Sequence, residues 1–287
     1  MREIDINSND NTLFVTSQCN NRCLMCAQPP LKKNDIEFCY QKNLAIIDSA
    51  PKELTDLGIT GGEPTLLGTR LFDLIRYIQY NLSQTLIHIL TNGRAFADFN
   101  YTKELTKVNC TNLLLGVPVH SDNSGDHDFI TQVNGSYSET LKGLYYLGQA
   151  GIPIELRIVI NRINYSRLPQ IARFIYKNLP FVDYISFMGL EDTGYSVKNH
   201  VQIWIEPTRY QEQLEEAVLD LATWGMNVSI FNLPHCLLKS SLYEFARKSI
   251  SDWKVTYLPV CNNCHAKPEC CGLFATSKQQ SNQIHFI

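Results

Sequence analysis

The sequence predicts an α/β protein whose core is a partial barrel of six β-then-α units, followed by a cysteine-rich extension. Short apolar, β-prone segments alternate with longer segments of helical periodicity through most of the chain. A glycine-rich turn directly follows one strand-like segment, which is typical of parallel α/β sheets. The last fifty or so residues lose this alternation and are rich in cysteine. We therefore expect a core over residues 1–195 and an extension over residues 196–287.

The expected elements of the core follow one another in a regular order. Strand-like segments lie at residues 13–16, 55–59, 85–90, 112–119, 154–160 and 184–188. Helical segments between them lie at residues 37–49, 71–82, 99–107, 137–149 and 168–178. Successive β-then-α units favour parallel strands joined by right-handed crossovers, and a sheet of this kind can curl into a partial barrel. The side chains expected to be buried in the first helix are Phe38, Leu44, Ile46 and Ile47.

Residues 120–136 are polar, and we expect them to form an irregular loop at the mouth of the barrel. Their acidic and imidazole side chains, Asp122, Asp126, His127 and Asp128, look like a metal cluster. A solvated polar loop is the preferred interpretation of the same residues. After residue 189 the pattern weakens to one helical segment at 208–224 and one short strand at 227–231.

Composition excludes several functional classes. The chain has 287 residues, 44% of them hydrophobic, and a net charge of −3 without a dense Lys/Arg run, so we expect no nucleic-acid partner. No apolar run reaches the length of a membrane span, and the N-terminal residues do not begin a secretory signal. Ten cysteines in such a chain are expected to be reduced, and their clustering points to metal binding or catalysis. The sequence therefore predicts a cytoplasmic metalloprotein without a membrane partner.

The first cysteine cluster follows the first strand-like segment. Cys19, Cys23 and Cys26 have the spacing C-x3-C-x2-C. Thiolates favour iron–sulfur clusters or zinc, and a [4Fe–4S] cluster normally has a cysteine on each of four irons. Three cysteines leave one iron available for another ligand, which indicates chemistry rather than structure. The alternative is a structural zinc site with a fourth ligand elsewhere in the chain.

A glycine-rich motif follows the second strand-like segment. Gly61, Gly62, Glu63 and Pro64 come directly after residues 55–59 and Thr60, which places them at the carboxyl edge of the sheet, where parallel α/β folds bind ligands. Glycines at that position allow the backbone to approach a ligand closely, and proline stiffens the turn. By itself the motif is a weak signal. About forty residues after a three-cysteine loop it is strong.

Together the two motifs resemble the radical S-adenosylmethionine (radical SAM) superfamily over residues 13–194. The resemblance implies a radical SAM barrel in which Cys19, Cys23 and Cys26 are catalytic and hold a [4Fe–4S] cluster. In that family the fourth iron binds the methionyl amino and carboxylate groups of SAM, and the backbone at 61–63 receives the amino group. One electron then splits SAM into methionine and a 5′-deoxyadenosyl radical, which abstracts hydrogen from the substrate. An electron donor such as flavodoxin or ferredoxin is implied.

Five further residues are candidates for the SAM site. Met25 stands where the family commonly has an aromatic residue, and its thioether can still pack against an adenine ring. Arg157 lies in the strand where many members direct a basic side chain at the SAM carboxylate, although it could equally be an exterior arginine paired with a helix carboxylate. Thr91 and Asn92 end the third strand and either line the adenosine pocket or form a turn. Ser121, after the fourth strand, is a candidate for contact with the ribose or the substrate.

The tail carries a second metal signal. Cys261, Cys264 and Cys270 are spaced C-x2-C-x5-C, and Cys236 supplies a fourth thiolate that would close one site. This pattern resembles the auxiliary [4Fe–4S] sites of peptide-modifying radical SAM enzymes. The alternative is a zinc knuckle with the same four ligands. Cys271 competes with Cys270 for the fourth place, and spacing favours Cys270.

Several phrases narrow the resemblance. Residues 14–26, 28–30, 188–191 and 249–254 resemble the maturases of the His-Xaa-Ser peptide system, in particular their C-type radical SAM member. The resemblance implies a ribosomally made peptide as substrate and a second radical SAM protein as partner. Two alternatives stay open. One is a radical SAM enzyme that acts on a small molecule such as a nucleoside precursor, and the other is a non-catalytic iron–sulfur or zinc protein.

Overall fold

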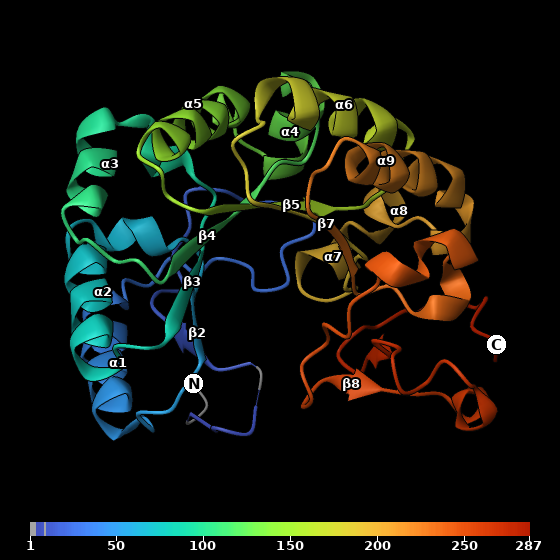
Figure 1. Ribbon diagram of the computed structural model, residues 1–287, viewed down its shortest axis with the longest axis horizontal. Helices are drawn as coiled ribbons and strands as arrows, with labels where there is room; N and C mark the ends of the chain where they lie inside the picture. The colour runs from blue at the N-terminus through green and yellow to red at the C-terminus, as the bar shows by residue number, and fades with distance from the viewer. Residues whose placement is uncertain (1–3, 9) are drawn as a thin grey trace. The chain divides into compact units, whose positions relative to one another are not determined.

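In the computed structural model, which describes residues 4–8 and 10–287, seven strands form one sheet in the order of the sequence, β1 to β7 (Figure 1). The chain divides into two compact units. The first contains the residues up to 22, residues 28–118 and residues 135–155, and the second contains residues 23–27, 119–134 and 156–287. The α/β class with a cysteine-rich C-terminal region is confirmed. The predicted boundary at residue 195 lies within the second unit and stays a prediction.

The first unit is built on parallel strands. Its complete strands are β1 (Thr12–Phe14), β2 (Asp56–Thr60), β3 (Leu86–Leu90) and β4 (Leu113–Pro118). Its helices are α1 (Ile36–Ser49), α2 (Arg70–Asn81), α3 (Phe99–Thr106) and α5 (Ser136–Gln149). Leu57 pairs with Ile87 and Ile59 with Ile89, and all four are buried, as the two-residue period of a strand requires. Figure 1 shows α1, α2 and α3 along one side of β2 to β4.

The second unit has parallel strands of its own. Its strands are β6 (Tyr184–Met188), β7 (Val228–Phe231) and most of β5 (Ile154–Val159). Its helices are α4 (Ser124–Thr131), α6 (Leu168–Asn178), α7 (Tyr195–Lys198), α8 (His200–Ile203) and α9 (Gln211–Thr223). Ile160 donates its N–H to the Met188 carbonyl at 2.9 Å, beyond the end of β5. β7 pairs in parallel with β6, so the short strand expected at residues 227–231 is the seventh strand of the sheet.

The prediction of an irregular loop at residues 120–136 is wrong, because this segment contains α4. Asn123 caps the helix: its side-chain oxygen accepts the Asp126 N–H at 3.0 Å. Asp126 stands in the first turn, where a negative charge is favourable. Gln132 ends the helix in the left-handed conformation with φ of 60°. The prediction took the polar residues of this segment as evidence for a loop, whereas Asn123 is the N-cap of a helix.

The buried face of α1 also differs from the predicted one. Phe38 was expected to be buried but is 70% exposed, whereas Ile47 is fully buried. The buried stripe of α1 consists of Cys39, Asn43 and Ile47. Asn43 is tolerated there because its side-chain amide donates to the Phe14 carbonyl at 3.0 Å. The buried residues are spaced four apart, and the prediction missed this spacing because one of them, Asn43, is polar.

The cysteine-rich tail has little regular structure. A two-residue strand, β8 (Val255–Thr256), pairs antiparallel with β9 (Leu273–Phe274). Ile250, Cys271 and Phe274 form a small buried cluster beside this pair. No helix in the described part of the chain is long and apolar enough to cross a membrane.

Candidate active site

The Gly-Gly-Glu turn after β2 packs directly on the backbone that leads into the first cysteine loop. Gly62 donates its N–H to the Thr16 carbonyl at 2.7 Å, and Glu63 donates its N–H to the Gln18 carbonyl at 2.8 Å. A Cβ atom on Gly62 would lie 2.0 Å from the Gln18 oxygen, and one on Gly61 would lie 2.5 Å from the Thr16 oxygen. The sequence predicted that the backbone at these glycines approaches a ligand closely. In this unit it approaches the backbone of residues 16–18 of the chain itself.

The Glu63 side chain joins the end of β2 to the end of β3. It is 1% exposed, and its carboxylate accepts the Thr91 hydroxyl at 2.6 Å and the Asn92 N–H at 2.7 Å. The backbone N–H and hydroxyl of Thr65 donate to the same carboxylate at 3.0 and 2.7 Å. The structure thus brings the predicted residues Glu63, Thr91 and Asn92 together, with Glu63 as the acceptor that organises the other two.

The segment after β3 also holds the cysteine loop. Asn92 donates its side-chain amide to Asn20 Oδ1 at 2.6 Å. Arg94 donates to the Asn20 carbonyl at 2.9 Å and to Asn21 Oδ1 at 2.6 Å. In turn, the Asn21 N–H points at Cys19 Sγ, 3.3 Å away. Arg94 was not predicted. Its only sequence signal was its place directly after the Thr-Asn-Gly turn.

Residues 23–27 belong to the second unit and are held there by backbone contacts. Leu24 donates its N–H to the Ile130 carbonyl and Tyr195 donates its N–H to the Cys26 carbonyl, both at 2.9 Å. Met25 is 8% exposed and packs in a cluster with Leu24, Ile130 and Ile203. α4, the helix that the sequence did not predict, thus supports the loop that contains two of the three cysteines.

Gly194 is a second residue that sequence reasoning missed. Its φ is +60°, and a Cβ there would lie 2.4 Å from the Cys26 oxygen and 2.6 Å from the Ala27 oxygen. The neighbouring Asp192 is 1% exposed and accepts the Ser196 hydroxyl at 2.9 Å and the Gln279 N–H at 3.2 Å. The tail is therefore tied to the residues that pack on the end of the cysteine loop. The only indication of these residues in the sequence was the tripeptide Asp-Thr-Gly at positions 192–194.

Ser121 is the buried member of a polar network. It is 0% exposed, and its hydroxyl oxygen lies 3.3 Å from a carboxylate oxygen of Asp122 and 3.3 Å from one of Asp126, so it can donate to either. Arg167 binds Asp122 through two hydrogen bonds of 2.7 Å. Burial opposes ionisation of Asp122, but the Arg167 guanidinium outweighs it and lowers the pKa of that carboxyl. The expectation of a solvated loop is wrong for these residues, since they anchor α4.

Two histidines lie beside this network. His120 donates its backbone N–H to His127 Nδ1 at 3.3 Å, and both side chains are buried. Burial lowers the pKa of His120 to about 3 and that of His127 to about 4, so both are neutral in the folded protein. Among residues 4–8 and 10–287, no three His, Cys, Asp or Glu side chains gather closely enough to hold a single metal ion.

Arg157 lies in β5, as predicted, and is half-buried. Its carbonyl accepts the Val119 N–H at 3.1 Å. A role at a SAM carboxylate stays a prediction.

Four tail cysteines surround one cavity. Cys236, Cys261, Cys264 and Cys270 all line one partly open cavity, which no Asp or Glu side chain among the described residues lines. Cys271 is not part of this lining. A hydrogen bond between the adjacent thiols lowers the pKa of Cys270 and raises that of Cys271. All ten cysteines lie in the described part of the chain and are thiols, not disulfides.

Comparison with known proteins agrees with this arrangement. The family model described as the Radical SAM superfamily matches residues 13–175. The "Tungsten-containing aldehyde ferredoxin oxidoreductase cofactor-modifying protein" of Pyrococcus furiosus is 28% identical over 170 residues, which are 57% of this chain and 47% of that protein. The "AdoMet-dependent heme synthase" of Oleidesulfovibrio alaskensis is 25% identical over 225 residues, 77% of this chain and 55% of that protein. The chain thus spans about half the length of these relatives.

Solved structures show the same fold at low sequence identity. Streptococcus suis SuiB bound to S-adenosylmethionine has a TM-score of 0.61 and 15% identity, covering 78% of this chain and 50% of SuiB. The protein anSMEcpe, solved with AdoMet and the Kp18Cys peptide, has a TM-score of 0.60 and 18% identity, covering 76% of this chain and 62% of that chain.

Proposed function

Because the chain belongs to the Radical SAM superfamily, we propose that it is an enzyme that modifies a ribosomally synthesised peptide after translation by abstracting hydrogen from it. Cys19, Cys23 and Cys26 would hold the [4Fe–4S] cluster that this family implies. When bound and reduced, the cluster supplies the electron that splits SAM into methionine and a 5′-deoxyadenosyl radical. The three thiols are half-buried and have the spacing that leaves one iron available to SAM.

The observation that carries the proposal is the fixed backbone at both ends of the cysteine loop. In the first unit the Gln18 carbonyl is bound by Glu63, and in the second the Cys26 carbonyl is bound by Tyr195. A loop held at its backbone presents its thiols with little freedom, which suits a preorganised metal site. The N–H groups of Gly62 and Glu63 donate within the chain, so an ammonium group would be received there by carbonyl oxygens.

We assign the tail cysteines to an auxiliary [4Fe–4S] cluster. A zinc knuckle needs four sulfurs about 2.3 Å from one ion. The thiols of Cys236, Cys261, Cys264 and Cys270 line one pocket among the described residues. Their spacing resembles that of the auxiliary [4Fe–4S] sites of peptide-modifying radical SAM enzymes, which supports a cluster rather than zinc. Cys270 is the fourth ligand rather than Cys271, because only Cys270 lines the cavity.

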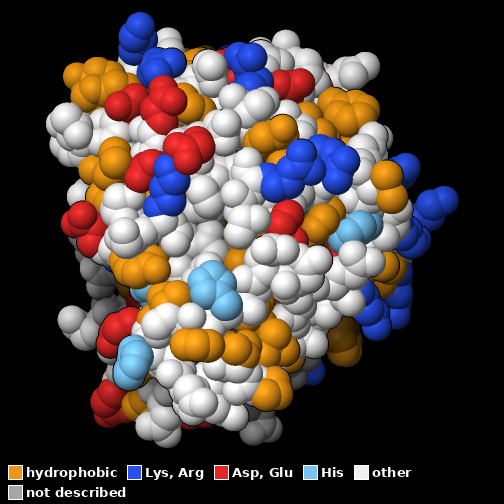
Figure 2. All heavy atoms as spheres, turned by 90° about the vertical axis from the view of Figure 1, so that its right-hand side faces the viewer, with side chains coloured by type: hydrophobic (Ala, Val, Ile, Leu, Met, Phe, Trp, Pro, Cys, Tyr) orange, Lys and Arg blue, Asp and Glu red, His pale blue; other side chains and the backbone are white. Residues whose placement is uncertain are grey.

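A peptide substrate is supported by two features. The four-cysteine cavity follows the radical SAM core, as in peptide-modifying members of the family. The fold neighbours include SuiB bound to the precursor peptide SuiA, at a TM-score of 0.60 and 14% identity. The resemblance to His-Xaa-Ser maturases adds a second radical SAM protein as partner and flavodoxin or ferredoxin as electron donor. Figure 2 shows basic side chains gathered toward the right-hand edge of one face and acidic ones mostly toward its left.

A small-molecule substrate is the second candidate. It is favoured by the likeness to the heme synthase of Oleidesulfovibrio alaskensis, which extends over 77% of this chain. Heme chemistry acts on a tetrapyrrole, so a bulky planar metabolite would replace the peptide in this alternative.

The test begins with SAM cleavage. After anaerobic reconstitution, dithionite and SAM should yield 5′-deoxyadenosine, and the triple variant Cys19→Ala, Cys23→Ala, Cys26→Ala should yield none. Undiminished 5′-deoxyadenosine in the triple variant would refute the assignment of these cysteines. The chain is then co-expressed with a peptide encoded beside its gene, and the peptide is examined by mass spectrometry. An unmodified peptide together with turnover of a small metabolite would favour the second candidate.

A further inference from the structure

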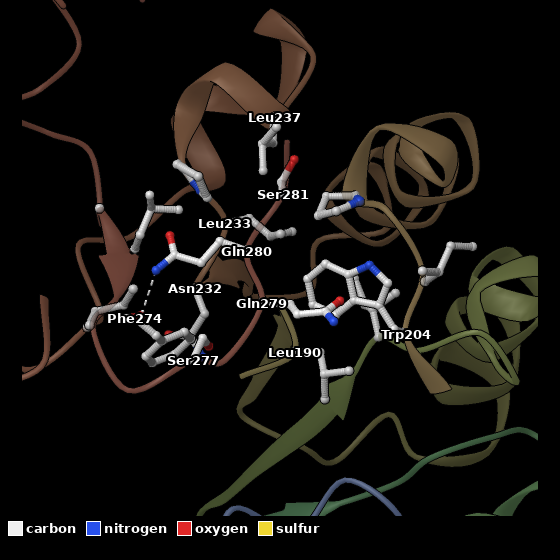
Figure 3. Close-up of a pocket in the computed structure, with 18 of the residues that line it drawn as sticks. Leu190, Trp204, Asn232, Leu233, Leu237, Phe274, Ser277, Gln279, Gln280 and Ser281 are labelled. Carbon is white, nitrogen blue, oxygen red and sulfur yellow. Dashed lines mark hydrogen bonds between the residues drawn. The ribbon is translucent and has the colours of Figure 1, made fainter. Parts of the chain in front are cut away.

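A second pocket, which shares Pro234, Gly272 and Leu273 with the four-cysteine cavity, lies at the carboxyl ends of three strands of the second unit (Figure 3). Ile160 follows β5, Leu190 follows β6 and Asn232 follows β7, and all three line it. Residues 272–274 and Ser281 of the tail line it from the other direction. The pocket is partly open to solvent, so a side chain could enter it from outside. Carboxyl ends of parallel strands are where α/β folds bind their ligands.

The lining combines apolar side chains with amides and hydroxyls, and among the described residues it contains one buried side-chain acceptor without a partner. None of its described lining residues is charged. Asn232 Oδ1 accepts the Ser249 hydroxyl at 3.0 Å, and the Ser277 hydroxyl accepts the Asp192 N–H at 3.0 Å. Gln280 donates its Nε2 to the Phe274 carbonyl at 2.9 Å, the dashed line in Figure 3. The Oε1 atom of Gln280 is buried and has no hydrogen-bond partner among the described residues.

The walls indicate the shape of the ligand. Trp204 faces the space in Figure 3, and its ring stacks on His200 with an interplanar angle of 16° and centroids 5.3 Å apart. Phe274 and Leu190 supply further apolar surface. Aromatic walls favour a flat ligand group, because offset and edge-to-face packing adds to the burial of its surface. A buried acceptor without a partner is unfavourable unless the ligand brings a donor.

We propose that this pocket binds an aromatic side chain of the peptide substrate that carries one O–H or N–H donor, with tyrosine as the model. The donor pairs with Gln280 Oε1, and the ring packs against Trp204. This inference rests on the proposed peptide substrate and names its specificity determinant. Gln280 is a specificity residue that touches the bound residue, so its effect falls on affinity rather than on SAM cleavage. A charged side chain is disfavoured, because the described lining offers it no counter-charge.

The experiment compares capped peptides that differ by one atom. The dissociation constants of acetyl-Ala-Tyr-Ala-amide and acetyl-Ala-Phe-Ala-amide are measured by anaerobic titration calorimetry on the reconstituted full chain. We expect the Tyr peptide to bind roughly three- to tenfold more tightly, the usual effect of one hydrogen bond to a neutral acceptor. Gln280→Leu should abolish this difference and leave Phe-peptide binding unchanged. Gln283→Leu is the control, because Gln283 is exposed and does not line the pocket.

A further variant separates the acceptor from the Nε2 bond to Phe274. Gln280→Glu keeps an acceptor and loses the amide donor, so it should retain the preference for Tyr. Equal affinities of the two peptides for the wild-type chain, or an unchanged preference in Gln280→Leu, would overturn the inference. Binding of p-cresol as tight as that of the Tyr peptide would assign the pocket to a small molecule and would also overturn it. Peptide modification without any preference for Tyr would refute the pocket assignment and leave the proposed function standing.

Discussion

At the scale of single residues, the structure changes the reason why a glycine is needed at position 62. The sequence predicted that a side chain here would obstruct a ligand, but the nearest atom is the Gln18 carbonyl, immediately before Cys19. We predict that Gly62→Ala lowers the free energy of unfolding by roughly 1–3 kcal/mol, because the backbone must shift to admit a methyl group. The shift displaces Cys19, so the variant should also bind less iron after reconstitution.

Gly125→Ala is the matched control for this change. Gly125 lies in α4, and a Cβ there would meet only the side-chain oxygen of Asn123, at 3.4 Å. Urea denaturation and iron analysis of both variants provide the measurement. Wild-type stability and iron content in Gly62→Ala would contradict the packing explanation.

His120 and His127 predict a pH dependence of stability. Their pKa values are lowered by burial to about 3 and about 4, whereas an unfolded histidine titrates near 6.5. Below pH 6.5 the unfolded chain therefore binds more protons, so stability is complete above 6.5 and is lost as the pH falls toward 4. Between pH 7 and 5 the loss should be on the order of 2 kcal/mol for each histidine.

The measurement is urea denaturation of the iron-free protein at several pH values. His127→Gln should show a shallower decrease between pH 7 and 5 than the wild type does. A parallel decrease in the two proteins would indicate that other groups govern the acid sensitivity.

At the scale of elements, most of the architecture was available in the sequence. The predicted strands agree with the observed ones to within about two residues. Strands of a parallel sheet are buried on both faces, so they are visible in the sequence as short apolar runs. α4 was missed, since Ile130 is its only buried apolar residue among His127, Ile130 and Thr131, and its start depends on the cap of Asn123 and the ion pair of Asp122 with Arg167. Asn43, a polar residue in the buried stripe of α1, similarly depends on a partner 29 residues away.

The cap of α4 can be tested directly. Asn123→Ala removes the acceptor for the Asp126 N–H and the donor to Ser121, so we expect a loss of about 1–2 kcal/mol of unfolding free energy. Hydrogen exchange in residues 124–131 should accelerate. Asn178→Ala, at the exposed end of α6, should change neither quantity. Unaltered exchange in α4 would show that the cap is dispensable.

At the scale of the whole molecule, the metal content distinguishes the two views of the tail. We predict about eight iron and eight sulfide per chain if both sites hold [4Fe–4S] clusters. Cys270→Ser should reduce the iron by about half, and Cys271→Ser should leave it unchanged because Cys271 does not line the cavity. About four iron with one zinc in the wild type would establish a zinc knuckle instead.

The candidate site was predictable only in part. Its cysteines and glycines were visible because their chemistry and spacing are local. The supporting residues were not, since Arg94 contacts Asn20 across 74 positions and Asp192 contacts Gln279 across 87. Such pairs depend on the completed fold, and a single sequence contains no signal for them.

The tie between Asp192 and the tail has a consequence for protein synthesis. Residues 277–279 are made about 250 positions after Cys26, a delay of roughly 10–50 s at ribosomal rates of 5–20 residues per second. Until then Asp192 lacks the N–H of Gln279, and Gly194 must pack on Cys26 and Ala27 without that support. The support that the tail gives to Asp192, beside the end of the cysteine loop, is therefore acquired only when translation is nearly finished.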